Sequence, residues 1–317
     1  MLKNRWISDG RNWVLSKMEK LRRFIRRETR RGQGISRAVM LEHTLFSLPL
    51  AICAFLLESG GRPGFSTVLW ILLAVFAARN GANALNRLID RKIDAENPRT
   101  ADRDLPSGRV KLRDLWIFTI VCGLLFLFSA AMLNPLCLFL VPLGALLIGG
   151  YSFTKRFTWL CHFWLGITCS AAVMGSFLAL SGRFEIRYFP LTIAAALWIA
   201  GFDIIYALQD IDHDRSHGIH SVPARFGYPG ALYIAGMSHG GTLFFLLVNM
   251  AFFKVGLWYA AGVVIAALIL VAEHILAWKG DVKWIPLASY HLNQILSPVV
   301  LLFTVLDIYM PGGLYGL

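Results

Sequence analysis

Residues 112–132 read LRDLWIFTIVCGLLFLFSAAM, and no charged residue follows Asp114 in this stretch. About 20 apolar residues in an α-helix are enough to cross the hydrocarbon core of a bilayer. Eight more apolar stretches of similar length lie on either side of this one. The nine candidate spans are 41–58, 65–90, 112–132, 136–153, 158–180, 189–211, 230–253, 257–278 and 285–310. The sequence therefore predicts an all-α, polytopic membrane protein with nine transmembrane helices.

The composition of the chain agrees with this prediction. Of its 317 residues, 56% are hydrophobic and 16% are charged, whereas soluble domains average about 45–50% and 25%. The formal net charge is nevertheless +12. The apolar content excludes a soluble nucleic-acid-binding protein, and the 13% aromatic content excludes a disordered basic protein. We therefore expect the lipid bilayer, and no nucleic acid, as a partner.

The positive charge is concentrated at the N-terminus. Residues 1–40 hold twelve basic and three acidic residues, so this segment supplies nine of the twelve net charges. It has no continuous apolar run and is not a secretory signal peptide. We predict a basic cytoplasmic arm over residues 1–38 and a transmembrane domain over residues 39–317. The arm is either an interfacial amphipathic helix or a solvated tail that only enforces topology.

The remaining basic residues predict the orientation. With the N-terminus in the cytoplasm, the cytoplasmic side holds 26 of the 31 Lys and Arg residues. They lie in the arm, in the connections after spans two, four, six and eight, and, as Arg87 and Arg113, at the adjoining span ends. The opposite connections hold four: Arg62, Arg183, Arg187 and Lys254. Because cytoplasmic loops of membrane proteins are enriched in Lys and Arg, nine spans with a cytoplasmic N-terminus are predicted.

The second span ends in a face of oxygen-bearing side chains. Asn86, Asp90 and Asp94 are spaced four residues apart, so on a helix they stack about 6 Å from one another. The two carboxylates repel each other and lie at the negative end of the helix dipole. Protonation, basic neighbours or a divalent cation would relieve this repulsion, and these hard oxygen ligands suit Mg²⁺.

A second acidic face ends the sixth span. Asp203, Tyr206, Asp210 and Asp214 share a helix face, whereas Asp212 is predicted to point to solvent. Both faces end spans that run in the same direction, which predicts a parallel internal repeat. Two sets of carboxylates on one cleft suit a diphosphate bridged by metal ions.

Basic residues accompany both faces. The segments 97–108 (NPRTADRDLPSG), 151–156 (YSFTKR) and 215–225 all fall on the predicted cytoplasmic side, and their Lys and Arg groups suit phosphate oxygens. Arg79 lies about 16 Å before Asp90 along the helix, inside the membrane. We predict that Arg79 pairs with an intramembrane acid such as Asp203 or with the carboxylate of an acceptor substrate.

With these motifs in place, the chain resembles the UbiA-type family of intramembrane aromatic prenyltransferases. Residues 86–94 are similar to the family's first acidic motif, 203–214 to its second, and 97–108 and 151–156 to its basic loops. The resemblance implies a helix bundle around a central cavity that holds Mg²⁺ and an isoprenyl diphosphate. It implies metal or diphosphate ligands at Asn86, Asp90, Asp94, Asp210 and Asp214. It implies further catalytic residues at Asp203 and Tyr206, and substrate-binding residues at Arg79, Arg99, Arg103, Tyr151, Lys155 and Arg156.

The expected reaction is transfer of a polyprenyl group from polyprenyl diphosphate to a ring carbon of an aromatic acid. The resemblance is to a bacterial quinone-pathway branch, with a 4-hydroxybenzoate-like acceptor for ubiquinone or menaquinone, or 1,4-dihydroxy-6-naphthoate in the futalosine route. The expected location is the bacterial inner membrane, with the active site facing the cytoplasm. A cation-coupled transporter is the alternative from another class. The same superfamily also includes heme and chlorophyll prenyltransferases, which differ in their acceptor.

Overall fold

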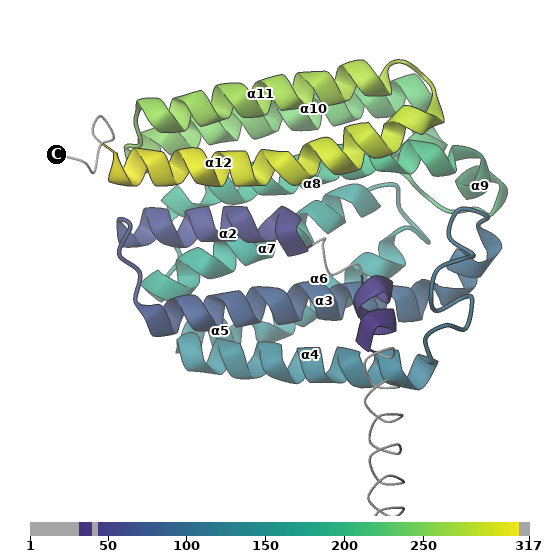
Figure 1. Cartoon of the computed structure of the whole chain (residues 1–317), viewed down its shortest axis with the longest axis horizontal. Helices are drawn as coiled ribbons and strands as arrows, with labels where there is room; N and C mark the ends of the chain where they lie inside the picture. Colours follow the sequence, from purple (N-terminus) through teal and green to yellow (C-terminus); the bar gives the residue numbers. More distant parts are fainter. Residues whose placement is uncertain (1–31, 40–43, 311–317) are drawn as a thin grey trace, which may run out of the picture.

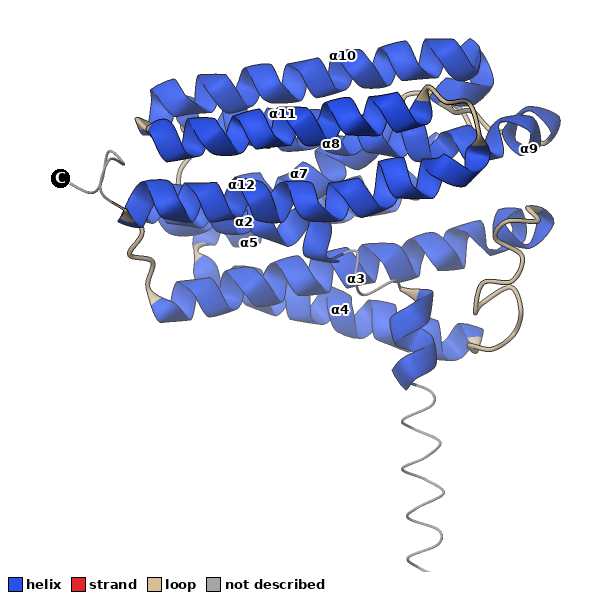
Figure 2. Ribbon diagram, turned by 45° about the horizontal axis from the view of Figure 1, so that its top comes forward, coloured by secondary structure: helices blue, strands red, loops and turns tan. Residues whose placement is uncertain are grey.

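The computed structural model describes residues 32–39 and 44–310, and within these ranges the chain is helical with no strand (Figures 1 and 2). A short helix covers residues 32–38. The longer helices are α2 (Thr44–Ser59), α3 (Phe65–Glu96), α4 (Leu112–Leu133), α6 (Val141–Thr154), α7 (Cys161–Ser181), α8 (Phe189–Ala207), α10 (Val222–Phe253), α11 (Leu257–Ala277) and α12 (Leu292–Tyr309). Short turns connect them: α5 (Pro135–Phe139), η2 (Ile186–Tyr188), η3 (Leu208–Asp210), α9 (Ile211–Ser216), η4 (Val282–Trp284) and η5 (Leu287–His291).

Seven helical segments of the described chain are long and apolar enough to cross a membrane. They are Phe65–Glu96, Leu112–Leu133, Cys161–Ser181, Ile186–Ser216, Val222–Phe253, Leu257–Ala277 and Val282–Tyr309. Two shorter apolar helices, Leu48–Ser59 and Val141–Thr154, lie at the first and fourth predicted spans. The all-α, polytopic membrane class is thereby confirmed. Nine spans, the orientation and the internal repeat stay predictions, and residues 1–31 of the predicted arm lie outside the described residues.

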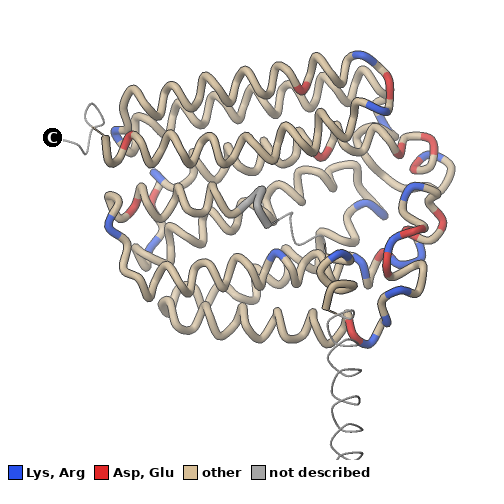
Figure 3. Tube along the Cα trace, in the orientation of Figure 1, with Lys and Arg blue, Asp and Glu red and all other residues tan. Residues whose placement is uncertain are grey.

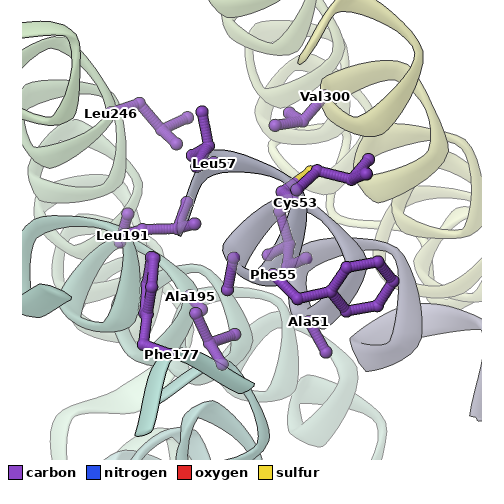
Figure 4. Close-up of a cluster of buried hydrophobic side chains, with 14 of the residues drawn as sticks. Ala51, Cys53, Phe55, Leu57, Phe177, Leu191, Ala195, Leu246 and Val300 are labelled. Carbon is purple, nitrogen blue, oxygen red and sulfur yellow. The ribbon is translucent and has the colours of Figure 1, made fainter. Parts of the chain in front are cut away.

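The helices run lengthwise in a bundle (Figure 1). Helix α8 packs against α7 and α10, α3 against α4, and α11 against α12. Helix α2 lies against α7 and α12 and presents Ala51, Cys53, Phe55 and Leu57 to a cluster of buried apolar side chains (Figure 4). Phe177 in this cluster stacks on Tyr188 with ring centroids 4.5 Å apart.

Close approach of helices α7 and α8 depends on a glycine. A Cβ atom at Gly166 would lie 2.2 Å from the backbone oxygen of Ala196. In a bilayer, lipid tails are as apolar as leucine, so helices associate mainly through close packing at small residues. Gly166 therefore brings α7 and α8 together and, with them, the polar residues that both helices carry.

Charged residues gather at the two ends of the bundle and leave its middle nearly free of charge (Figure 3). The connections after α3, α6, α9 and α11 lie together at one end, which we call the motif end because both acidic motifs finish there. The opposite end holds residues 60–64, 182–185 and 254–256. This separation follows the alternation of basic and sparsely charged loops that the sequence predicts.

Candidate active site

A cavity of about 730 Å³ runs along the inside of the bundle. Its apolar part reaches Phe184 and Phe189, near the end opposite the motifs. At the motif end its lining becomes polar. The predicted site residues that line it are Arg79, Asn86, Asp90, Asp94, Arg99, Arg103, Tyr151, Lys155, Asp203, Tyr206, Asp210 and Asp214. The structure thus brings twelve of the thirteen predicted site residues to one cavity.

The exception is Arg156, which does not line the cavity. Its guanidinium donates a 3.1 Å hydrogen bond to the backbone oxygen of Ile89 and lies 3.5 Å from Oδ1 of Asp90. The Arg156 side chain is 42% exposed. It therefore supports the first acidic face from outside, and the expectation that it binds substrate directly gains no support from this position.

The first acidic face lies on α3, with the predicted four-residue spacing. Asn86 donates a 2.7 Å hydrogen bond to Oδ2 of Asp90, and Nζ of Lys155 lies 2.7 Å from the same oxygen. Asp94 pairs with Arg103 at 2.7 Å and with Arg87 at 3.5 Å. Both carboxylates are buried, so basic neighbours relieve the repulsion between them in this structure.

The second acidic face departs from the predicted single helix. Helix α8 ends at Ala207, a 3₁₀ turn covers Leu208–Asp210, and α9 begins at Ile211. This break redirects the chain, yet Asp203, Asp210 and Asp214 all line the cavity. Asp214 accepts a 2.7 Å hydrogen bond from Ser221. Asp212 is exposed, as predicted.

The loop after α3 joins the two acidic faces. Arg99 donates to both carboxylate oxygens of Asp210, with Nε 2.8 Å from Oδ1, and Asn97 donates to Oδ1 at 2.9 Å. Arg99 also donates to the hydroxyl of Tyr206 at 2.8 Å. Burial alone would lower the pKa of Arg99, but Asp210 and Tyr206 outweigh it and raise the pKa above its usual value. Arg99 is therefore a permanent cation between the motifs.

The charges around the cavity are balanced. Five carboxylates line it, and so do five cationic side chains, those of Arg79, Arg87, Arg99, Arg103 and Lys155. Lys and Arg side chains bind phosphate oxygens with the same bidentate, charge-assisted hydrogen bonds that they form here with carboxylates. The site can therefore exchange its internal ion pairs for contacts with an anionic ligand.

The donor set fits a magnesium ion that is shared with a ligand. All candidate ligands on the two faces are carboxylate or amide oxygens. Oδ1 of Asp90 is buried and, among the described residues, has the ion pair with Arg156 at 3.5 Å but no hydrogen bond. Within the described residues, no three His, Cys, Asp or Glu side chains lie close enough to hold a metal on their own. Mg²⁺ is usually bound by one or two carboxylates together with waters and substrate phosphates, so this arrangement suits it.

Arg79 has a different partner from the predicted acid. Its Nη1 lies 2.8 Å from Sγ of Cys169, whereas Asp203 pairs with His162. Helix α3 carries Arg79 to the cavity, and helix α8 carries Asp203. Helix α7 places Cys169 next to Arg79 and His162 next to Asp203. The Arg79–Asp203 pair was therefore wrong, and a role toward an acceptor carboxylate stays a prediction.

Sequence reasoning missed several residues that the structure places at this site. Arg87 and Asn97 contact the acidic faces, and His162 and Cys169 contact the deeper Asp203 and Arg79. Arg87 and Asn97 stand inside the quoted motifs and were available as a signal. His162 carries only the signal of a polar residue in an apolar stretch, which most often marks a structural hydrogen bond.

Comparisons with known proteins agree on one family. The model of the UbiA prenyltransferase family matches residues 47–290. A 4-hydroxybenzoate octaprenyltransferase from Shewanella loihica is 31% identical over 65% of this chain and 77% of its own length. One from Pseudomonas fluorescens is 32% identical over 68% of this chain and 73% of its own length.

Solved structures share the fold. A UbiA homolog from Aeropyrum pernix K1 matches with a TM-score of 0.78 and 32% identity, over 85% of this chain and 99% of that one. A UbiA homolog from Archaeoglobus fulgidus bound to GPP and Mg²⁺ matches with a TM-score of 0.61 and 18% identity, over 86% and 98%. The family model covers most of this chain, and the matches to relatives of 31% and 32% identity cover most of each relative's length. This chain therefore belongs to the UbiA prenyltransferase family.

Proposed function

We propose that the chain transfers a polyprenyl group from polyprenyl diphosphate to a ring carbon of an aromatic acid and requires Mg²⁺. The observation that carries this proposal is the Arg99–Asp210 bridge between two acidic faces at the polar end of one long cavity. A diphosphate matches the polar end in charge, and a polyprenyl chain matches the apolar remainder.

The charge balance supports a metal-bound diphosphate. The carboxylates that line the cavity equal its Lys and Arg side chains in number, so a diphosphate adds negative charge that the side chains do not neutralise. Mg²⁺ would be held by Asn86, Asp90 and Asp94 on one side and by Asp210 and Asp214 on the other. When bound, it would stabilise the departing diphosphate as a Lewis acid.

The chain's own residues then act on the two substrates. Lys155, Arg99 and Arg103 are 26–30% exposed at the cavity mouth, where they can turn from their carboxylates to the diphosphate oxygens. Tyr151 and Tyr206 lie just inside this mouth on the cavity wall. The apolar wall keeps water from the allylic cation that remains when the diphosphate leaves, so that the electron-rich ring attacks it instead.

Arg79 is the proposed contact for the acceptor carboxylate. It lies about two helical turns deeper than Asn86, and within the described residues its hydrogen-bond partner is the thiol of Cys169. A half-buried guanidinium inside the bundle favours a carboxylate as its counterion. The relatives are named 4-hydroxybenzoate octaprenyltransferases, which supports 4-hydroxybenzoate as the acceptor and a role in ubiquinone or menaquinone synthesis. 1,4-Dihydroxy-6-naphthoate, also an aromatic acid with a hydroxyl group, is the alternative acceptor.

We further propose the location and domain roles. The basic connections at the motif end favour a cytoplasmic active site in a bacterial inner membrane, with residues 39–317 as the transferase domain. The basic arm, residues 1–38, would contact the anionic lipid surface. The acids lie at helix ends beside basic loops, which disfavours a cation-coupled transporter with acids at mid-membrane.

The decisive experiment is a transfer assay in membranes that contain the chain. Labelled polyprenyl diphosphate and Mg²⁺ are supplied with 4-hydroxybenzoate or 1,4-dihydroxy-6-naphthoate in turn. We expect label in one prenylated acid, and none with the double variant Asp90→Asn, Asp210→Asn. The matched control is Asp212→Asn, which changes an exposed acid on α9. Full activity of the double variant would contradict the proposed site.

A further inference from the structure

The proposed reaction releases a proton, and we infer that His162 accepts it, held and polarised by Asp203. This inference rests on the proposed function and adds a base to it. His162 lies in the first turn of α7, and Asp203 lies in the last turns of α8. Both line the cavity, and Asp203 lies about two helical turns before Asp210 along the chain.

The geometry commits one ring nitrogen of His162 and leaves the other available. Nδ1 of His162 lies 2.7 Å from Oδ2 of Asp203. A carboxylate in this position holds a hydrogen on Nδ1, so the lone pair of a neutral ring is on Nε2. Nε2 is buried, and no described residue forms a hydrogen bond with it. A buried nitrogen without a partner needs an explanation, and a substrate proton supplies one.

The surroundings of the pair distinguish Asp203 from the other carboxylates. Asp90, Asp94 and Asp210 each pair with Lys or Arg, and Asp214 accepts a hydrogen bond from Ser221. Asp203 pairs with a histidine instead. The other titratable groups that act on the pair are the thiols of Cys161 and Cys169 on α7 and the hydroxyl of Tyr151 on α6. Arg79 of α3 contacts Cys169 beside them.

The proton balance of the reaction requires such a base. The ring carbon forms a bond to the allylic carbon as the bond from that carbon to the diphosphate oxygen breaks. The ring then loses the hydrogen on the attacked carbon, and the electron pair of that C–H bond restores aromaticity. Nε2 of His162 takes the proton, and Asp203 stabilises the resulting imidazolium. The proton passes to water at the mouth when the products leave.

The test compares two variants of His162 in the full chain. Asn in His162→Asn keeps an N–H group for Asp203 but has no basic nitrogen, and His162→Ala leaves space for an added base. We expect kcat to fall about 10²- to 10⁴-fold in both, with little change in KM for the prenyl diphosphate. Imidazole in the assay should restore activity to His162→Ala. Acceptor deuterated at the attacked carbon should show a primary isotope effect with His162→Asn.

The control is His291→Asn, an exposed histidine that does not line the cavity and should retain full activity. Binding of the prenyl diphosphate by each purified variant verifies that it is folded. Wild-type kcat in His162→Asn, or no rescue of a diphosphate-binding His162→Ala by imidazole, would overturn this inference alone. A wild-type chain that prenylates neither aromatic acid would instead contradict the proposed function.

Discussion

Arg99, in the loop after α3, forms two hydrogen bonds with the carboxylate of Asp210 in the 3₁₀ turn after α8, one of them 2.8 Å from Nε to Oδ1. The same guanidinium donates to Tyr206. These contacts join two motifs that are more than a hundred residues apart in sequence. They also place a cation where the proposed diphosphate would bind, so we expect Arg99 to exchange Asp210 for the diphosphate when the donor binds.

Replacement of Arg99 by Lys tests this exchange. Lysine keeps the charge but cannot make two parallel hydrogen bonds. Hydrogen bonds to charged groups contribute about 1.5–3 kcal/mol, so kcat/KM for the prenyl diphosphate should fall roughly 10- to 100-fold. Initial rates at varied prenyl diphosphate give this ratio. Arg113→Lys, an exposed arginine at the start of α4, is the control and should match the wild type.

Metal removal tests the acidic faces. Chelation by EDTA should abolish transfer, and Mg²⁺ should restore it, because the balanced charges of the cavity leave a diphosphate without counterions. The Mg²⁺ concentration for half-maximal rate should rise in Asp90→Asn, which loses a buried carboxylate at the first face. Asp281→Asn, an acid of the α11–α12 connection, should leave the Mg²⁺ dependence unchanged. Transfer that persists in EDTA would exclude the metal.

The apolar part of the cavity should determine which donors are accepted. Met174 of α7 lines this part, and Met174→Trp fills it with a larger side chain. We expect kcat/KM for a long polyprenyl diphosphate to fall about tenfold more than that for geranyl diphosphate, equivalent to ~1.4 kcal/mol. Met237→Trp is the control because Met237 is exposed on α10. An equal fall in kcat/KM for both donors would mean that the polyprenyl group of the donor does not bind in this part of the cavity.

Local spacing predicted much of the fold and the acidic faces, because helical periodicity depends only on neighbours along the chain. Asn86, Asp90 and Asp94 lie on one face of α3, as their spacing requires. The break at Leu208–Asp210 was not predicted, since the same spacing fits a continuous helix. The residues still reach the cavity because the 3₁₀ turn displaces them by only part of a turn.

Partners from different helices could not be predicted in the same way. The contacts from Arg79 to Cys169 and from His162 to Asp203 depend on how α3, α7 and α8 pack. Packing of α7 on α8 depends in turn on Gly166, and its role becomes visible only when the positions of both helices are known. Sequence reasoning therefore paired Arg79 with the nearest available acid by charge, and it gave His162 no catalytic role.

The orientation can be tested with single cysteines. Arg113 and Arg183 are exposed at opposite ends of the bundle. A membrane-impermeant maleimide added to intact spheroplasts should label Arg183→Cys and not Arg113→Cys, because basic loops stay in the cytoplasm. Inverted vesicles should give the reverse. The wild-type chain gives the background signal, since four of its five cysteines are buried and Cys137 is half-buried. Labelling of Arg113→Cys in spheroplasts would contradict the cytoplasmic active site.

Gly166 provides a test of the packing that builds the site. The Cβ of Gly166→Ala would meet the backbone oxygen of Ala196, which cannot rotate away as a side chain can. Forcing extra volume into a packed interface costs about 1–3 kcal/mol, so the melting temperature in detergent should fall. Gly175→Ala on the same helix is the matched control, since no atom lies within 4 Å of its Cβ. Alanine also has a higher helix propensity than glycine, so Gly175→Ala should melt at no lower temperature than the wild type. If both variants melted alike, close contact between α7 and α8 at Gly166 would not stabilise the bundle, and the position of His162 beside Asp203 would need another cause.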